Sequence, residues 1–245
     1  MMGSDEGFRL RVSIFSFLYS WICLLLVTFT TLRFSHLLKM GAFTADKGSV
    51  RVEGLEALPD GSFALAVNHF GGAGTLRVLA VTLRALAARD AVLADRLVVV
   101  TGQRASKGKP ASWLKRRLRA LVNWGFQRWA DNVLRISLDE EKQSIQALRQ
   151  WKKVAGDRPT LVFPEGKARL RFGELREGSG LWLRNLKVPV VPCAVFWQDG
   201  IWTVRFAPPL KWTEDQSLSD VQLGMSIARL LPAPLTPLWN RALGR

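Results

Sequence analysis

The sequence predicts an α/β protein with one domain built on a mostly parallel, helix-flanked sheet, preceded by an N-terminal membrane-associated helical segment. Beyond residue 40, short apolar runs alternate with longer segments of helical period. Before them lies a long apolar stretch without a charge, residues 12–32. The chain of 245 residues, 48% of them hydrophobic, is long enough for one sizeable core, which argues against a disordered or repeat protein.

The apolar stretch VSIFSFLYSWICLLLVTFTTL would form a helix about 31 Å long, close to the thickness of a bilayer's hydrocarbon core. Its Ser and Thr residues also permit a helical hairpin or an in-plane helix, and we favour the full span. A secretory signal peptide fits less well, since no small-residue cleavage site follows. We expect three parts: a membrane-associated segment at 1–40, the α/β domain at 41–231 and a C-terminal tail at 232–245 without readable periodicity.

The α/β domain is predicted from its short apolar runs and two helical patterns. One helix is expected at Thr75–Arg89, from leucines at helical spacing, and another at Leu138–Val154, after a capping-box-like Ser137 and Glu140. A further helix is expected before the last long strand. The expected strands are Phe63–Val67, Leu97–Thr101, Val133–Ile136, Thr160–Phe163, Val190–Phe196 and Trp202–Phe206.

The formal net charge of +15 indicates an anionic partner: nucleic acid, an anionic membrane surface or a phosphorylated small molecule. The segment 104–129 mixes Arg and Lys with tryptophans. This composition suits a helix in the lipid headgroup region, and a solvated helix face or a nucleic-acid contact are alternatives. With a membrane segment in the same chain, we favour the interfacial helix and expect no nucleic-acid partner.

Two motifs carry candidate chemistry. Asn68 and His69 follow the first core strand and precede a glycine-rich turn, the place where α/β sheets usually hold ligands. The second motif is Phe163-Pro164-Glu165-Gly166, which also ends a β-like run and is followed by an arginine-rich loop and the apolar run Val188–Phe196. Taken alone, His69 could be a structural or merely exposed histidine. Glu165 could likewise be a turn carboxylate paired with a nearby arginine.

Together these motifs resemble the phospholipid/glycerol acyltransferase family, the membrane enzymes that acylate lysophosphatidic acid and related lysolipids. The resemblance spans roughly residues 50–210. It rests on Asn68-His69, on a strand near Val133–Arg135 where the family often has an arginine, on Phe163-Pro164-Glu165-Gly166, and on the VPVVP run at 188–192. The segment RFAPPL at 205–210 resembles the one that usually follows.

The resemblance implies acyl transfer from a thioester donor, acyl-CoA or acyl carrier protein, to the hydroxyl of a lysophospholipid or glycerol-phosphate-type acceptor. His69 would act as general base, with Glu165 as the second catalytic residue. The acceptor would be held by Asn68, Arg135, Gly166, Lys167 and Arg169. No cofactor or metal is required, the membrane lipids are partners, and the basic domain is expected on the cytoplasmic face of the membrane.

Two positions depart from the family pattern. The aspartate that the family carries five residues after its histidine is Gly74 here, and Lys167-Ala168 replaces a usual Thr-Arg pair. Another carboxylate, first of all Glu165, could orient His69; a backbone carbonyl could do so in a slower enzyme; or catalysis could be lost. For Arg135, a surface pairing with Asp131 or Glu140 is the alternative to phosphate binding.

Three hypotheses therefore remain from the sequence: an active membrane acyltransferase, a catalytically silent relative that binds lipid or acyl thioester, and a membrane-tethered nucleic-acid binder that leaves both motifs without a purpose. A serine hydrolase is disfavoured because no G-x-S-x-G elbow is present. The two cysteines, Cys23 and Cys193, lie in apolar runs, so neither a disulfide framework nor a zinc site is expected.

Overall fold

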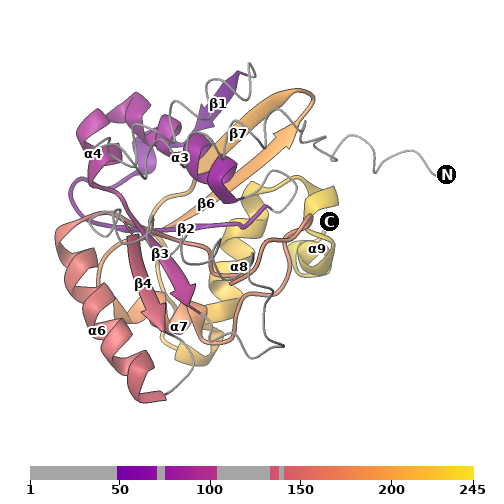
Figure 1. Cartoon of the computed structure of the whole chain (residues 1–245). Helices are drawn as coiled ribbons and strands as arrows, with labels where there is room; N and C mark the ends of the chain where they lie inside the picture. Colours follow the sequence, from indigo (N-terminus) through magenta and orange to yellow (C-terminus); the bar gives the residue numbers. More distant parts are fainter. Residues whose placement is uncertain (1–48, 71–74, 104–132, 138–140) are drawn as a thin grey trace, which may run out of the picture.

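The computed structural model describes residues 49–70, 75–103, 133–137 and 141–245, and these form one seven-stranded sheet with helices around it (Figure 1). The strand order is β1-β7-β6-β2-β5-β3-β4. The strands are β1 Val50–Glu53, β2 Ala64–Val67, β3 Val98–Gln103, β4 Val133–Ser137, β5 Thr160–Val162, β6 Val190–Gln198 and β7 Ile201–Phe206.

The sheet is mostly parallel. Strands β6, β2, β5, β3 and β4 run in one direction, whereas β7 pairs antiparallel with β6 and β1 pairs parallel with β7. The α/β class and each predicted strand are confirmed, although several ends differ by one or two residues. Strand β1 was not predicted, and the sequence analysis gave no direction for β7.

The reversal between β6 and β7 has a local cause. Gln198 pairs with Ile201, so the hairpin loop consists of Asp199 and Gly200 alone. Both residues have positive φ, 51° and 79°, as the two-residue turns that suit twisted hairpins require. The Asp-Gly dipeptide between two apolar runs is the sequence signal for this turn.

The helices lie on both sides of the central strands; in Figure 1, α3 and α4 are drawn above β2 and β6, and α7, α8 and α9 below them. The helix predicted at Thr75–Arg89 is confirmed with the same bounds as α3, while the one predicted at Leu138–Val154 is α6, Glu141–Asp157. The other helices are α4 Ala91–Arg96, α7 Ser179–Asn185, α8 Ser219–Leu230 and α9 Pro237–Leu243, with short 3-10 turns at Leu55–Ala57, Gln216–Leu218 and Ala233–Leu235.

The core is formed by the middle of the sheet and the apolar faces of α3 and α8. All four residues of β2 are buried, as are the first seven of β6, because helices cover both faces of these strands. Leu223 and Ile227 of α8 and Leu83 and Leu86 of α3 are also fully buried. This core fixes the position of the segments that leave the ends of β2, β5 and β6.

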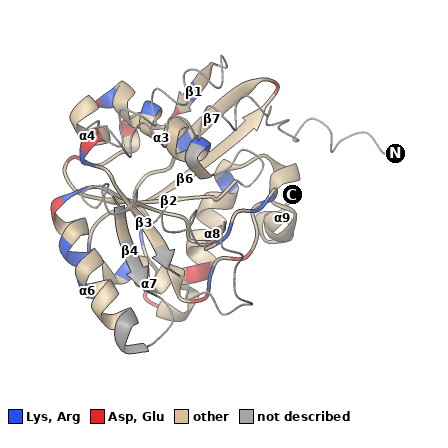
Figure 2. Ribbon diagram, in the orientation of Figure 1, with Lys and Arg blue, Asp and Glu red and all other residues tan. Residues whose placement is uncertain are grey.

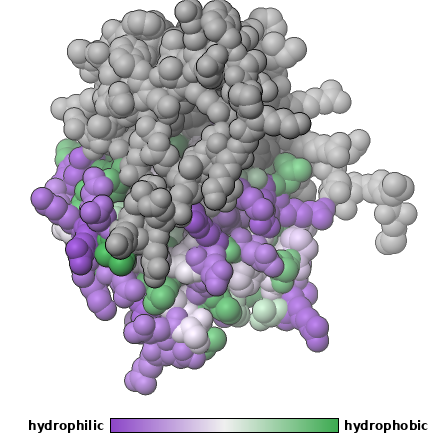
Figure 3. All heavy atoms as spheres, turned by 60° about the horizontal axis from the view of Figure 1, so that its bottom comes forward, coloured by the Kyte–Doolittle hydropathy of each residue, from purple (hydrophilic) through white to green (hydrophobic). Residues whose placement is uncertain are grey.

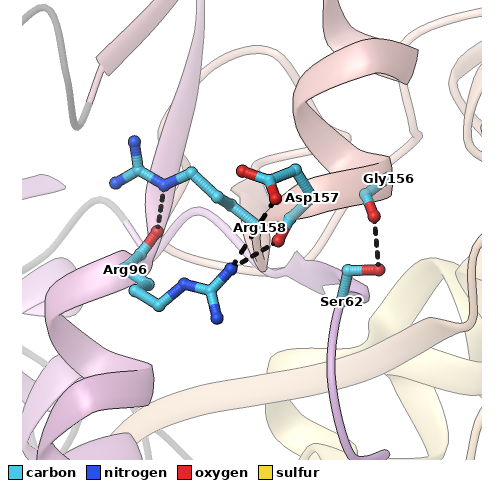
Figure 4. A network of polar contacts seen from close by, with 5 residues as sticks. All are labelled: Ser62, Arg96, Gly156, Asp157 and Arg158. Carbon is cyan, nitrogen blue, oxygen red and sulfur yellow. Dashed lines mark hydrogen bonds and ion pairs between the residues drawn. The ribbon is translucent and has the colours of Figure 1, made fainter.

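A polar network ties together the segments that lead into three parallel strands (Figure 4). Arg96 donates to the carbonyl of Asp157 at 2.6 Å, and Arg158 donates to the carbonyl of Arg96 at 3.0 Å. Ser62 donates to the carbonyl of Gly156 at 3.1 Å. Arg96, Arg158 and Ser62 come shortly before β3, β5 and β2, and Gly156 and Asp157 are the last residues of α6. The network therefore holds together the edge of the sheet at which these three strands begin.

Two predicted segments lie outside the described residues: the membrane segment at 12–32 and the basic, tryptophan-rich helix at 104–129. Within the described ranges, none of the helices is both long enough and apolar enough to cross a bilayer. The described residues that face the viewer in Figure 3 are mostly hydrophilic, with hydrophobic residues interspersed.

The C-terminal segment packs on the domain. Leu235 is buried, and its carbonyl accepts from the backbone N–H of Phe172 at 2.8 Å. Trp239 stacks on Phe172 with ring centroids 5.9 Å apart and donates its indole N–H to the carbonyl of Gly173 at 3.1 Å. Trp239 of α9 and Leu235 of the turn before it thus support the loop that follows β5. The predicted boundary at residue 232 stays a prediction.

Candidate active site

The two sequence motifs meet at one edge of the sheet because they follow neighbouring parallel strands. β2 pairs with β5 from Ala64 opposite Thr160 to Ala66 opposite Val162. His69 comes two residues after the end of β2, and Glu165 comes three residues after the end of β5. Since parallel strands end at the same edge, the sheet itself brings the histidine and the carboxylate together.

The backbone of His69 is held on both sides. Its N–H donates to Oε2 of Glu165 at 2.6 Å, and its carbonyl accepts from the N–H of Arg169 at 3.0 Å. Phe70 and Arg169 then form a parallel β-bridge. These hydrogen bonds connect the backbone of His69 to the arginine-rich loop after β5 and restrict its movement.

The imidazole of His69 has one apolar and one polar neighbour. Its ring stacks on Phe163, with centroids 4.3 Å apart and planes 19° from parallel. Nε2 lies 2.7 Å from the hydroxyl oxygen of Thr75, and Nδ1 has no hydrogen-bond partner among the described residues. Burial lowers the pKa of His69 below its usual 6.5, so the ring is mainly neutral at pH 7, the form that a general base needs.

Glu165 makes no hydrogen bond to the ring of His69. Its carboxylate is buried and accepts two backbone N–H groups, from His69 through Oε2 and from Gly173 through Oε1 at 3.2 Å. Burial raises its pKa to about 7, while the two N–H groups and the charge of Arg169 work in the opposite direction. The idea that Glu165 orients the imidazole in place of the missing aspartate is therefore wrong, because the carboxylate acts on the backbone.

Asn68 extends the pairing of β2 with β6. Its side-chain oxygen accepts the N–H of Val195 at 2.6 Å, and its amide nitrogen donates to the carbonyl of the same residue at 3.0 Å. The side chain is buried, so it continues the strand ladder beyond Val67. Its predicted contact with substrate stays a prediction.

The loop after β5 carries three predicted substrate-binding residues. Gly166 adopts φ +66° in the turn closed by its N–H and the carbonyl of Phe163, a conformation that favours glycine. Lys167 is exposed, and Arg169 is half-buried. The guanidinium of Arg169 lies over Gly173, where a Cβ atom would collide with it, and its Nε has no hydrogen-bond partner among the described residues.

Arg135 lies on the edge strand of the sheet. Its backbone pairs with Thr101 of β3, and β3 and β5 separate its strand from β2. Its side chain is outside the described part of the structure, so its predicted phosphate contact stays a prediction. Lys and Arg of the described residues are spread over several elements, including α4 and α6 (Figure 2).

Sequence reasoning missed two neighbours of the histidine, Phe163 and Thr75. Phe163 stands in the second motif, but its role as the stacking partner of His69 required the register of β2 and β5. Thr75 was visible as the first residue of the predicted helix, six positions after His69. A hydroxyl at the start of the helix that follows a candidate base is the signal that could have identified it.

The described residues contain no group of three or more His, Cys, Asp or Glu side chains arranged to hold a metal ion. Cys193, on β6, is completely buried, and burial raises the pKa of its thiol, so this cysteine is an inert core residue. The predicted absence of a cofactor stays a prediction.

Comparison with known proteins supports the α/β acyltransferase fold. The structure is similar to the crystal structure of the 1-acyl-sn-glycerophosphate (LPA) acyltransferase PlsC from Thermotoga maritima, with a TM-score of 0.52 and 16% sequence identity. The match covers 89% of this chain and 95% of the other. No family model matches the sequence, and no curated protein matches it.

The fold is thus similar to that of this LPA acyltransferase, at a sequence identity of only 16%. Because likeness at this identity establishes the fold alone, the chemistry of the chain has to be argued from its own residues.

Proposed function

We propose that the protein is a membrane-associated acyltransferase that moves an acyl chain from a thioester to the hydroxyl of a lysophospholipid or glycerol-phosphate-type acceptor. The observation that carries the proposal is the immobilised His69. Its backbone is bonded on both sides, its ring is stacked on Phe163, and its lowered pKa keeps it neutral. A fixed, neutral imidazole at the end of a central parallel strand is suited to general-base catalysis.

In this reaction His69 takes the proton from the acceptor hydroxyl as the oxygen attacks the thioester carbonyl. A C–O bond forms, the C–S bond breaks, and the imidazolium returns its proton to the departing thiolate. Glu165 acts through His69 as a positioning residue, since its oxygens are bonded to the N–H groups of His69 and Gly173. No cofactor enters beyond the thioester, carried by coenzyme A or an acyl carrier protein.

The phosphate of the acceptor would be held by the loop after β5. Half-buried Arg169 lies beside the backbone of His69, its Nε is buried without a hydrogen-bond partner among the described residues, and exposed Lys167 adds a second cation. Guanidinium groups bind phosphate through parallel N–H bonds, which makes Arg169 the main candidate. Arg135 would add a further cation, and Gly166 and Asn68 would shape the loop and the strand end on which these groups stand.

The apolar segment 12–32 would anchor the chain, so that membrane lipids supply the acceptor and the basic domain faces the cytoplasm. This arrangement explains the +15 charge without a nucleic-acid partner.

The test is thiol release and acyl-product formation by the full-length, detergent-solubilised protein with acyl-CoA and with acyl carrier protein donors. Lysophosphatidic acid and other lysophospholipids serve as acceptors, and a monoacylglycerol without phosphate is the matched control. We expect turnover with phosphorylated acceptors and at least tenfold less with the monoacylglycerol. Absence of product with every donor and acceptor would contradict the proposal.

A catalytically silent, lipid-binding relative is the second candidate, and Gly74 favours it. In serine proteases, replacement of the carboxylate that orients the histidine lowers turnover by on the order of 10⁴. The Gly74→Asp variant in the same assay separates the candidates. Activity that appears only in Gly74→Asp would support the silent relative, whereas activity already present in the wild type would support the enzyme.

A further inference from the structure

The loop after β5 holds an exposed leucine beside the candidate active site. The side chain of Leu170 is 58% exposed and lies in the sequence between Arg169 and Arg171. The N–H of Arg169 donates to the carbonyl of His69 at 3.0 Å, and Phe70 and Arg169 form a β-bridge. Leu170 therefore comes directly after the residue that is bonded to the backbone of the candidate base.

The backbone on both sides of Leu170 is tied to the rest of the domain. Before it stands the β-bridge to the segment that leaves β2. After it, the N–H of Phe172 donates to the carbonyl of Leu235 at 2.8 Å, and the N–H of Gly173 donates to the carboxylate of Glu165 at 3.2 Å. Because these bonds hold the chain before and after Leu170, its exposure is a property of the folded loop.

The charges around Leu170 distinguish it from the other large apolar side chains that are exposed among the described residues. Within three positions of Leu170 the sequence holds three cations, Lys167, Arg169 and Arg171, and no acidic residue. The other exposed large apolar residues have one cation or none within the same distance: Val92, Ile145, Leu218, Val221 and Leu238. An apolar side chain among cations suits an anionic lipid surface, where phosphates attract the cations and the side chain enters the boundary of the acyl chains.

Resting on the proposed function for the choice of a membrane, we propose that the segment 167–171 docks the α/β domain on an anionic lipid surface. Leu170 enters the layer between headgroups and acyl chains, and the cations beside it meet lipid phosphates. Single exposed leucines are common on proteins, and the position of this one gives it a consequence. A docked loop brings His69 to the level of the headgroups, where a lysophospholipid carries its hydroxyl.

The experiment places an environment-sensitive fluorophore beside Leu170 and leaves Leu170 itself unchanged. Ala168 is exposed, so Ala168→Cys accepts the label in the full-length protein with Cys23 replaced by serine, while Cys193 is fully buried. The labelled protein is reconstituted in phosphatidylcholine vesicles with or without phosphatidylglycerol. Nitroxide groups on the lipid acyl chains quench a fluorophore that reaches the boundary of the acyl chains.

Val92→Cys supplies the matched control position. Val92 is 62% exposed on α4, which comes just before β3, so it lies near the edge of the sheet where the strands begin. In vesicles with phosphatidylglycerol, we expect the label at position 168 to be quenched about twofold or more above the label at position 92. Without phosphatidylglycerol this difference should shrink, because the lipid surface no longer attracts the cations.

A charge at position 170 tests the role of the leucine itself. Leu170→Glu, added to the Ala168→Cys protein, should abolish the extra quenching, because a carboxylate replaces the apolar side chain and is repelled by anionic lipid. Val92→Glu, added to the same Ala168→Cys protein, introduces the same charge on α4 and should leave the quenching at position 168 unchanged.

The two proposals fail separately, because quenching does not require turnover. Equal quenching at positions 168 and 92, or quenching at position 168 that persists in Leu170→Glu, would overturn the docking role of the loop. Quenching that does not depend on phosphatidylglycerol would overturn the anionic lipid as the partner. A wild type without turnover would overturn the proposed function, and the quenching would still decide whether the loop meets lipid.

Discussion

At the scale of single residues, the site is organised around the environment of one imidazole. Burial lowers the pKa of His69 below its usual 6.5, the ring stacks on Phe163, and no carboxylate of the described residues is hydrogen-bonded to the ring. This differs from histidines that rely on an ionised partner, since here desolvation lowers the pKa of the ring.

Replacing Phe163 should therefore change the titration of the histidine. In Phe163→Ala the ring gains water, and we expect the pKa of His69 to rise toward its usual 6.5, with a lower kcat. Phe163→Leu keeps an apolar neighbour and serves as the matched control. An NMR titration measures both values, and a His69 pKa that falls in Phe163→Ala would contradict this account.

Glu165 predicts a pH dependence of stability. Its pKa is raised to about 7 in the folded protein, so the folded state binds the proton more tightly than the unfolded state between about pH 4.5 and 7. The stability that the protonated Glu165 side chain contributes to the folded state is fully present below pH 4.5 and is lost as the pH rises through 7. The change amounts to roughly 3 kcal/mol at most.

Denaturant titration from pH 4 to pH 8 measures the free energy of unfolding of the wild type and of Glu165→Gln. The comparison tests whether the stability depends on the ionisation of Glu165. The difference between the two proteins should shift in favour of the variant as the pH rises, because the variant has no carboxyl group to ionise. A difference that is constant with pH, or one that shifts in favour of the wild type, would show that the Glu165 pKa is not raised.

At the scale of elements, the ends of β2 and β5 position the residues of the candidate site, and the C-terminal helix α9 supports the loop after β5. The apolar runs and the helical period predicted the strands from Phe63 to Phe206 and the bounds of α3. The same patterns could not predict that Glu165 would bond the backbone of His69, because that contact depends on the register of β2 with β5. Strand β1 was missed since Val50–Glu53 is short and only partly buried at the sheet edge.

The C-terminal residues had no readable period, yet α9 supports the arginine-bearing loop through Trp239. We expect Trp239→Ala to lower the free energy of unfolding by about 2 kcal/mol and to raise KM for phosphorylated acceptors, because the loop holding Arg169 and Gly173 loses its support. Leu238→Ala is the matched control, since Leu238 is 54% exposed on the same helix. Equal behaviour of the two variants in melting and kinetics would refute the supporting role.

At the scale of the whole molecule, charge and the apolar N-terminal stretch predict how the chain meets a membrane. Surface attraction between a +15 protein and anionic lipid is screened as the Debye length falls from about 10 Å at 0.1 M salt to about 3 Å at 1 M. An apolar segment inserted in the bilayer is not affected in this way.

We therefore expect membranes from cells that express the full chain to retain it in 1 M salt and to release it only with detergent. Immunoblots of the washed and pelleted fractions measure this, with a peripheral basic protein as the control for complete washing. Release by salt alone would show that charge, and not the 12–32 segment, holds the protein on the membrane.

The central claim is that His69 is the base of an acyl transfer, and the turnover of His69→Ala tests it most directly. His36→Ala is the matched control, since these are the two histidines of the chain. With an acyl thioester and a lysophospholipid, we expect His69→Ala to lose about 100-fold or more of the wild-type kcat, as removal of a general base does, while His36→Ala keeps it. Turnover in His69→Ala within about twofold of the wild type would contradict the account.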